Sequence, residues 1–184
     1  MKPLLLVPHN DDETLFASFL MQKHRPNVVV VYQSVVQEAN GIAAGTREAE
    51  TAAALDVLLY GGAEWVQGSW PDDGSVPDEQ LAEWLSTVIF DRFGLAPVII
   101  PAFSPRGHRD HNQLCRVADG VFTDVLARYL TYDYDGPKQR RGVEVEPEPE
   151  WILRKLRALA CYRSQVLLGP HRFWLEDLRE YVTA

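Results

Sequence analysis

The chain alternates short apolar runs with longer stretches of helical spacing. Continuous apolar runs, which are typical of strands covered on both faces, occupy residues 4–8, 27–34 and 97–101. Segments with apolar residues at helical spacing follow the first two runs, at residues 13–23 and at Thr46–Leu59, where Thr46 is the expected N-cap. Because crossover helices join parallel strands, this alternation predicts an α/β fold with a mostly parallel central sheet and helices on both faces.

The rest of the chain continues this pattern less regularly. The further elements that the spacing predicts are a strand at 64–66, a helix at 77–93 with Pro77 in its first turn, a helix at 112–129, a strand at 130–134, and helices at 150–165 and 173–182. Residues 135–149 mix glycine, proline and both signs of charge, which is typical of a solvated loop or edge hairpin. The alternative for this segment is a loop that contacts substrate.

Composition limits the classes of function. A length of 184 residues suits a single domain, residues 1–184, with a real core. The formal charge of −8 argues against non-specific binding to nucleic acid or anionic membranes. No apolar stretch approaches the ~20 residues of a membrane span, and the N-terminus lacks the pattern of a signal peptide. Neither Cys115 nor Cys161 has a CxxC partner, so the sequence suggests neither a disulfide framework nor a zinc knuckle, and we expect a cytoplasmic protein. A homo-oligomer is possible.

Two clusters of histidine and carboxylate follow predicted strands. His9 comes directly after the run at 4–8 and is followed by Asp11 and Asp12, and a second cluster, His108 to His111, follows the run at 97–101. In an open α/β sheet, ligands bind beyond the carboxyl ends of the strands, where the strand order reverses. If the two strands are neighbours, both clusters meet at one edge of the sheet.

The residue types in these clusters suit a catalytic metal site. A catalytic zinc ion takes three protein ligands and keeps one position for water, and His9, Asp12 and His111 would supply two imidazoles and one carboxylate. The spacing of His9 and Asp12 lets a strand-to-helix turn direct both at one point, which leaves Asp11 free to accept a proton. The alternative is that the acidic residues only cap the following helix.

Four segments together resemble the PIG-L/LmbE-like de-N-acetylases. Residues 9–13 (HNDDE) look like that family's HPDDE motif with Asn10 in place of the proline, and residues 108–111 (HRDH) are similar to its HxDH segment. Residues 47–50 (REAE) resemble its RxxE helix start, and Lys155 with residues 162–165 (YRSQ) resembles its K…(Y/H)xSQ stretch. Asparagine is itself a good turn residue, so we expect the first motif to keep its loop.

The resemblance implies a Rossmann-like three-layer sandwich and a zinc-dependent hydrolase, with other first-row divalent ions as alternatives. The implied substrate is an N-acetylglucosamine-type amino sugar, free or in a glycoconjugate, which loses its N-acetyl group. By position, the resemblance makes His9, Asp12 and His111 the metal ligands.

The remaining roles come from the same resemblance. Asp11 matches the general base, His108 the histidine that stabilises the developing oxyanion, and Asp110 the acid that orients that ring. Arg47 matches a position associated with substrate binding. Glu13 continues the motif, and we expect it to cap or buttress the following helix.

Two further residues are candidates for substrate contact on their chemistry alone. Arg106 could bind a carboxylate or phosphate, although a solvated arginine is the alternative. Trp70 could stack on a sugar face, with ordinary packing as the alternative. Lys155 is expected either to pair with a carboxylate of the helix layer or to reach the site.

Other functions compete with de-N-acetylation. The same site could hydrolyse another sugar-linked amide. A non-catalytic α/β module that binds a sugar or nucleotide would have no chemical need for both Asp11 and His108. A metal phosphoesterase often uses two bridged metals, whereas this chain has strong ligands for only one.

Overall fold

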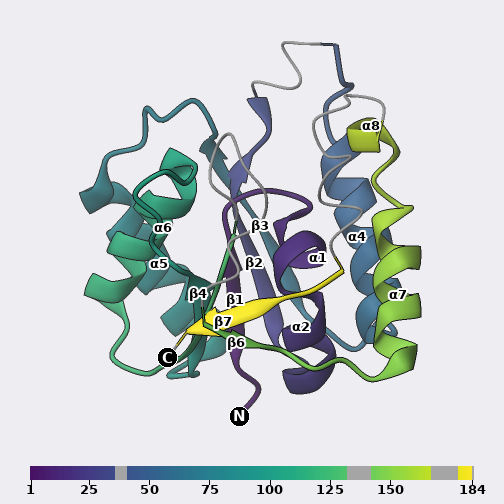
Figure 1. Ribbon diagram of the computed structural model, residues 1–184. Helices are drawn as coiled ribbons and strands as arrows, with labels where there is room; N and C mark the ends of the chain where they lie inside the picture. The colour runs from purple at the N-terminus through teal and green to yellow at the C-terminus, as the bar shows by residue number, and fades with distance from the viewer. Residues whose placement is uncertain (36–40, 132–141, 167–177, 184) are drawn as a thin grey trace.

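A computed structural model describes residues 1–35, 41–131, 142–166 and 178–183 as one sheet covered by helices (Figure 1). The strands of these residues are β1 Leu4–Val7, β2 Asn27–Gln33, β3 Trp65–Pro71, β4 Val98–Pro101, β5 Val125–Tyr129, β6 Val143–Glu144 and β7 Tyr181–Thr183. The helices are α1 Asp12–Phe16, α2 Ser18–His24, α4 Thr46–Leu59, α5 Asp78–Phe93, α6 Arg109–Val121, α7 Pro149–Leu159 and α8 Arg163–Val166. The chain therefore has the predicted α/β fold with a mostly parallel sheet.

Strand order places the two predicted clusters at the same edge. The sheet runs β3-β2-β1-β4-β5-β7-β6, and the first five strands in this order are parallel neighbours. The chain builds outward from β1 through β2 to β3 and then returns to place β4 on the other side of β1. The strand order reverses there, so the carboxyl ends of β1 and β4 lie next to each other.

Side chains of the central strands alternate between two helix layers. On β1, Leu5 and Val7 pack into the cluster of α1, α2, α4 and α7, whereas Leu4 and Leu6 pack into the cluster of α5 and α6. All four are fully buried, which explains why the run is apolar without interruption. The result is a three-layer sandwich with an apolar core on each side of the sheet.

The predicted helix at 13–23 is two short helices, α1 and α2, that break at Ala17. In a continuous helix the N–H of Phe19 would donate to the carbonyl of Leu15. Here Lys155 Nζ donates to the Leu15 carbonyl (3.0 Å), and Glu180 accepts from the Phe19 N–H (2.8 Å). Lys155 and Glu180 also form a fully buried ion pair with 2.5 Å between Nζ and Oε1. Lys155 therefore pairs with a carboxylate of the segment before β7, across the helix break.

Several predictions about the middle of the chain differ from the structure. The helix expected at 112–129 begins earlier, at Arg109, and ends at Val121, after which residues 125–129 form β5. A parallel ladder with β4 outweighs the helical spacing of residues 125–129. Of the strand expected at 130–134, residues 130 and 131 follow β5 outside any strand, and residues 132–134 lie outside the described residues. The strand expected at 64–66 instead runs from Trp65 to Pro71. Gly68 in the middle of this strand permits a close approach to β2, because a Cβ at this position would lie 2.1 Å from the Val31 carbonyl oxygen.

The ends of several elements also differ from expectation. Gly45, in a left-handed conformation, caps α4 in place of Thr46, and Pro77 lies at the N-cap of α5. The helix expected at 150–165 is α7 and α8 separated by a turn.

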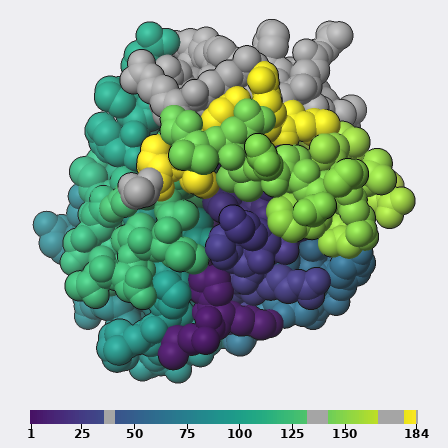
Figure 2. Space-filling view, turned by 60° about the horizontal axis from the view of Figure 1, so that its bottom comes forward, coloured from purple at the N-terminus to yellow at the C-terminus, as the bar shows by residue number. Residues whose placement is uncertain are grey.

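The C-terminal part holds one more correction. The end of the helix expected at 173–182 is wrong, because Tyr181–Thr183 pairs with β5 and β6 as an antiparallel strand. Residues 173–177 of that prediction and residues 135–141 of the predicted loop lie outside the described residues. Figure 2 shows the N-terminal segment in purple on the face that carries the amino end of β1, with residues 142–166 in green and the C-terminal strand in yellow beside each other.

Among the described residues, no helix has the length and apolar character needed to cross a bilayer.

The buried ion pair at the helix break generates the first prediction. Lys155→Met leaves the Glu180 carboxylate buried without its cation, so we expect the free energy of unfolding to fall by about 3–5 kcal/mol. The control is Arg92→Ala, because Arg92 pairs with Glu64 at the surface and its loss should change stability by less than ~1 kcal/mol. Urea denaturation measures both, and equal effects of the two changes would contradict the prediction.

Candidate metal centre and active site

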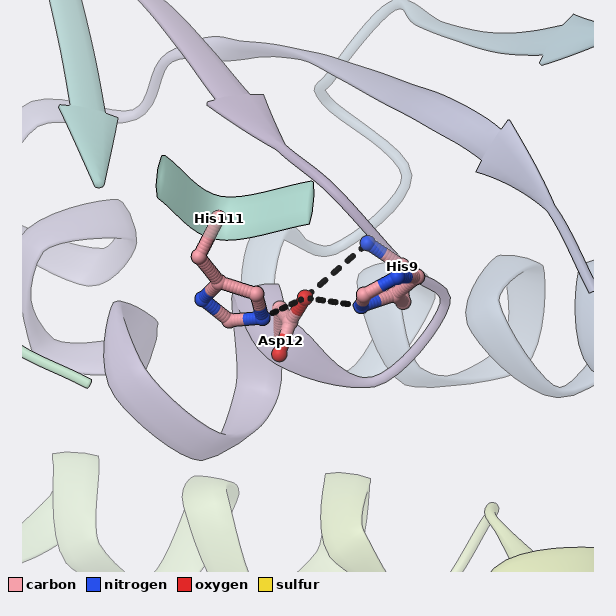
Figure 3. A group of neighbouring side chains, drawn as sticks. All are labelled: His9, Asp12 and His111. Carbon is pink, nitrogen blue, oxygen red and sulfur yellow. Dashed lines mark hydrogen bonds and ion pairs between the residues drawn. The ribbon is translucent and has the colours of Figure 1, made fainter. Parts of the chain in front are cut away.

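The two motifs meet at the carboxyl ends of β1 and β4. His9 lies in the turn after β1, Asp12 begins α1, and His111 lies in the first turn of α6. Asp12 Oδ2 is 3.2 Å from His9 Nδ1 and 3.2 Å from His111 Nε2, and it also accepts from the His9 backbone N–H (2.9 Å). Figure 3 shows both rings directed at this carboxylate. The sequence predicted these three residues as one group, and the fold brings them together.

The donor set of these residues fits a divalent first-row cation. Two imidazole nitrogens and one carboxylate oxygen lie within 4.8 Å of one another. Ligand atoms on a tetrahedral zinc ion, each ~2.1 Å from the metal, are about 3.4 Å apart, close to the 3.2 Å separations from Asp12. Asp12 and His111 are almost fully buried, so their arrangement is held by packing.

Asp110 lies between two histidines. Its Oδ2 is 2.9 Å from His9 Nε2 and 3.6 Å from His108 Nδ1. The Asp110 backbone N–H donates to His108 Nδ1 at 3.3 Å, which makes His108 the N-cap of α6. The carboxylate that was expected to orient His108 is thus closer to His9, and the backbone of the same residue contacts the His108 ring.

Burial and charge oppose each other at these groups. Burial favours the neutral form of His9, but hydrogen bonds and charges from Asp110 and Asp12 outweigh it and raise the pKa of His9 to about 10. Burial would raise the pKa of Asp12, but His111 and His9 hold it well below its usual range. Burial and the positive charge of His9 lower the pKa of His108 to about 4. The metal-free site therefore holds a charged His9 and a neutral His108 at neutral pH.

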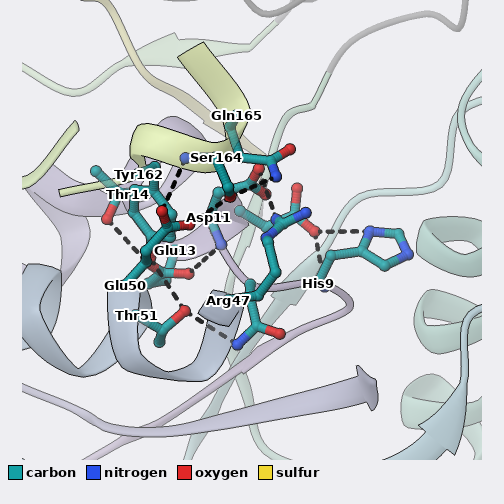
Figure 4. Close-up of polar contacts among 12 residues, drawn as sticks. His9, Asp11, Glu13, Thr14, Arg47, Glu50, Thr51, Tyr162, Ser164 and Gln165 are labelled. Carbon is teal, nitrogen blue, oxygen red and sulfur yellow. Dashed lines mark hydrogen bonds and ion pairs between the residues drawn. The ribbon is translucent and has the colours of Figure 1, made fainter. Parts of the chain in front are cut away.

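Asp11 has an unusual backbone and a buried cation beside it. Its φ of 112° and ψ of −27° lie in a backbone region where residues other than glycine are rare. Its N–H donates to Glu13 Oε2 (3.0 Å), and its carboxylate oxygen Oδ2 is 2.8 Å from Arg47 Nη2 (Figure 4). Arg47 is thus in contact with the predicted base itself, and its predicted contact with substrate stays a prediction.

The segments at residues 47–50 and 162–165 contact each other, and the second also contacts the turn at residues 9–13. Glu50, one turn after Arg47 on α4, accepts from the backbone N–H (2.8 Å) and the hydroxyl (2.6 Å) of Ser164. Tyr162, two residues before, donates its hydroxyl to Glu13. The fully buried Glu13 carboxylate has its pKa raised to about 7, mainly by burial. The C-terminal stretch therefore closes over the turn that carries Asp11 (Figure 4).

Sequence reasoning missed the residues that hold Asn10. The side-chain amide of Asn10 donates to Thr51 Oγ1 (3.0 Å) on α4 and to Gln67 Oε1 (2.8 Å) on β3. Gln67 in turn donates to the Tyr32 carbonyl at 3.0 Å. The only sequence signal for Gln67 is a polar side chain in a strand-forming segment, which does not indicate its partner.

The last two candidate residues lie in different environments. Trp70 packs edge-to-face against Trp84, with 6.4 Å between ring centroids, beside the core under α5 and α6. Arg106 is exposed in the turn that precedes His108. Neither arrangement tests a contact with substrate, so both assignments stay predictions.

Comparisons with known proteins agree with the motifs. The model of the PIG-L family, described as GlcNAc-PI de-N-acetylase, matches residues 4–122. No curated protein matches the chain.

Solved structures share the fold at low identity. A deacetylase triple mutant from the teicoplanin biosynthetic pathway has a TM-score of 0.72 and 21% identity, with 96% of this chain and 88% of that chain covered. The N,N'-diacetylchitobiose deacetylase from Pyrococcus horikoshii has a TM-score of 0.67 and 17% identity, with 95% and 73% covered. The 4-carboxy-2-hydroxymuconate hydratase GalB from Pseudomonas putida KT2440 has 0.68 and 16%, with 95% and 82% covered. Because the family model spans well over half of the sequence, the chain belongs to the PIG-L family.

Proposed function

We propose that this chain is a metal-dependent hydrolase that removes the N-acetyl group from an N-acetylglucosamine-type amino sugar or its conjugate. The observation that carries the proposal is the carboxylate of Asp11, held by Arg47 next to the group of His9, Asp12 and His111. Membership of the PIG-L family and the two deacetylases among the structural neighbours support it.

The proposed metal ligands are His9, Asp12 and His111, and zinc is the proposed ion. When bound, such an ion polarises the acetamide carbonyl and makes water acidic enough to attack near neutral pH. The protein keeps Asp12 ionised through its two histidine neighbours, so the carboxylate needs no deprotonation before it can coordinate a cation.

Asp11 is the proposed general base. It would take a proton from the attacking water as the oxygen bonds to the carbonyl carbon, and it would return that proton to the nitrogen as the C–N bond breaks. The products are acetate and the free amine. The Arg47 guanidinium lies 2.8 Å from the Asp11 carboxylate and pairs with its negative charge.

His108 is the proposed donor to the developing oxyanion. Because His108 Nδ1 accepts from the Asp110 backbone N–H, the proton of the neutral ring resides on Nε2. A neutral ring can therefore donate one hydrogen bond from Nε2 to the carbonyl oxygen as charge builds there. The lowered pKa of His108, about 4, favours this neutral ring near pH 7.

The activity is tested by release of free amine. We expect the purified zinc-loaded protein to deacetylate at least one member of a panel of N-acetylglucosaminides that includes N,N'-diacetylchitobiose and N-acetylglucosaminyl phosphatidylinositol. A chelator should abolish turnover and added zinc should restore it. Sugar amides with other acyl groups test the alternative that another amide is the substrate. A hydratase assay tests whether the chain instead adds water to a carbon–carbon double bond, because one structural neighbour is a hydratase. A folded protein that binds no metal and turns over no substrate would favour a binding module.

Substitutions should separate metal binding from turnover. Asp12→Ala removes the carboxylate between the two histidines, so we expect the purified variant to lose its metal. Asp11→Asn and His108→Ala should keep their metal and lose about a hundredfold in kcat. Asp56→Asn, an exposed change on α4, is the control and should change neither quantity. Elemental analysis and steady-state kinetics measure both, and full metal occupancy in Asp12→Ala would remove this residue from the ligand set.

Metal binding should release a proton from His9. The metal-free ring carries a proton up to a pKa of about 10, and a coordinating nitrogen must lose it. We therefore expect about one proton released per zinc at pH 7, and an apparent affinity that weakens about tenfold for each pH unit between pH 10 and pH 7.

Calorimetry in two buffers of different ionisation enthalpy counts the protons. The matched variant is Asp110→Asn, which removes the negative charge next to His9 Nε2 and should reduce the release at pH 8. Zinc binding with no proton release at pH 7 would show that His9 is neutral before the metal arrives.

A further inference from the structure

The backbone of Asp11 needs support from outside its own turn. Its positive φ is one of three among the non-glycine residues that the structure describes, and it lies furthest from the left-handed helical value. Such a conformation persists where the surroundings hold it in place. The hydrogen bonds around Asp11 identify the groups that do so.

The first of these groups is the Glu13 carboxylate. Oε2 accepts the N–H of Asp11 at 3.0 Å, and Oε1 accepts both the Thr14 hydroxyl (2.8 Å) and the Tyr162 hydroxyl. Glu13 is fully buried, so these donors take the place of water around its two oxygens. The position of the Asp11 amide is thereby tied to that of a carboxylate two residues further on.

The second group is the Tyr162 hydroxyl, which links Glu13 to α4. Tyr162 is 2% exposed, and its Oη is also 3.2 Å from Thr51 Oγ1. One phenol hydrogen cannot serve both neighbours, so with Tyr162 donating to Glu13 the Thr51 hydroxyl donates to Tyr162. Thr51 Oγ1 in turn accepts from the Asn10 amide.

These four hydrogen bonds join Asn10, Thr51, Tyr162, Glu13 and the Asp11 N–H, and the peptide bond between Asn10 and Asp11 closes them into a ring. Figure 4 labels Thr51, Tyr162, Glu13 and Asp11. The ring begins and ends within one turn of the chain but passes through α4 and through the segment between α7 and α8. Every donor in it has an acceptor, as a buried network requires if it is to be rigid.

We infer that Tyr162, acting through Glu13, is a positioning residue that holds Asp11 in its proton-accepting orientation. The inference rests on the proposed role of Asp11 as general base. Tyr162 lies outside the region matched by the family model, residues 4–122, and it is too deeply buried to reach a substrate. Its effect on catalysis must therefore pass through the turn that carries Asp11.

The main test compares two tyrosine hydroxyls that are equally buried. Tyr162→Phe opens the ring, and we expect kcat to fall about tenfold to a hundredfold with KM changed less than twofold and metal content unchanged. Tyr129→Phe is the matched control, because Tyr129 is fully buried and its hydroxyl donates to the Leu6 carbonyl at 3.0 Å, outside the ring. Tyr129→Phe should lower thermal stability and leave kcat within twofold.

Substitution of Glu13 gives a second, independent variant pair. Glu13→Gln keeps an oxygen for the Asp11 N–H and an amide that can donate to Tyr162, so we expect it to retain kcat within about fivefold. Glu13→Ala removes both contacts and should match or exceed the loss in Tyr162→Phe. If Glu13 acted only through its negative charge, Glu13→Gln would lose as much kcat as Glu13→Ala.

Amide hydrogen exchange at Asp11 provides a readout that needs no substrate. We expect the Asp11 N–H to exchange at least tenfold faster in Tyr162→Phe than in the wild-type protein, and no faster in Tyr129→Phe. Faster exchange in a protein that deacetylates nothing would leave the positioning in place and overturn the proposed function. Unchanged exchange, or equal losses of kcat in the two phenylalanine variants, would overturn the positioning role of Tyr162 whatever the substrate.

Discussion

The parallel pairing of β1 with β4 is the constraint on which the rest of the site depends. The register that sets Leu4 opposite Val98 and Leu5 opposite Ile99 brings two chain segments about a hundred residues apart to one edge of the sheet. His9 and His111 reach the same carboxylate only because their strands end side by side. The pairing is held by the fully buried aliphatic side chains of both strands, so the hydrophobic core sets the geometry of the polar site.

A polar site above a close-packed core needs a partner for each buried charge, and this structure supplies the partners from distant segments. Asp12 is held between two histidines, Asp11 faces Arg47, and Glu13 faces the Tyr162 hydroxyl. One turn below, Lys155 and Glu180 fill the break between α1 and α2. The same desolvation that makes an unpaired charge unfavourable thus makes these pairs specific.

The sequence predicted what is local and apolar, and it missed what depends on distant partners. The strand at Leu4–Val7, the helix at Thr46–Leu59 and the group of His9, Asp12 and His111 follow from runs, spacing and ligand chemistry. The break at Ala17 does not, because the groups that replace the lost helical hydrogen bond come from residues 155 and 180. The segment at 125–129 has helical spacing, yet it forms a strand because it pairs in parallel with the edge of β4. Both errors are cases in which tertiary contacts outweigh local preference.

Asn10 illustrates how one local change shifts the source of rigidity. The motif that this chain resembles has proline here, and a proline ring restricts φ without any partner. Asn10 has no such restriction, but its amide reaches Thr51 on α4 and Gln67 on β3, so two neighbouring elements restrain the turn instead. Since Thr51 also contacts Tyr162, the restraint on Asn10 and the support of Asp11 share one side chain. The stiffness of the turn is therefore a property of packed elements, and the orientation of Asp11 depends on how α4, β3 and the C-terminal stretch pack together.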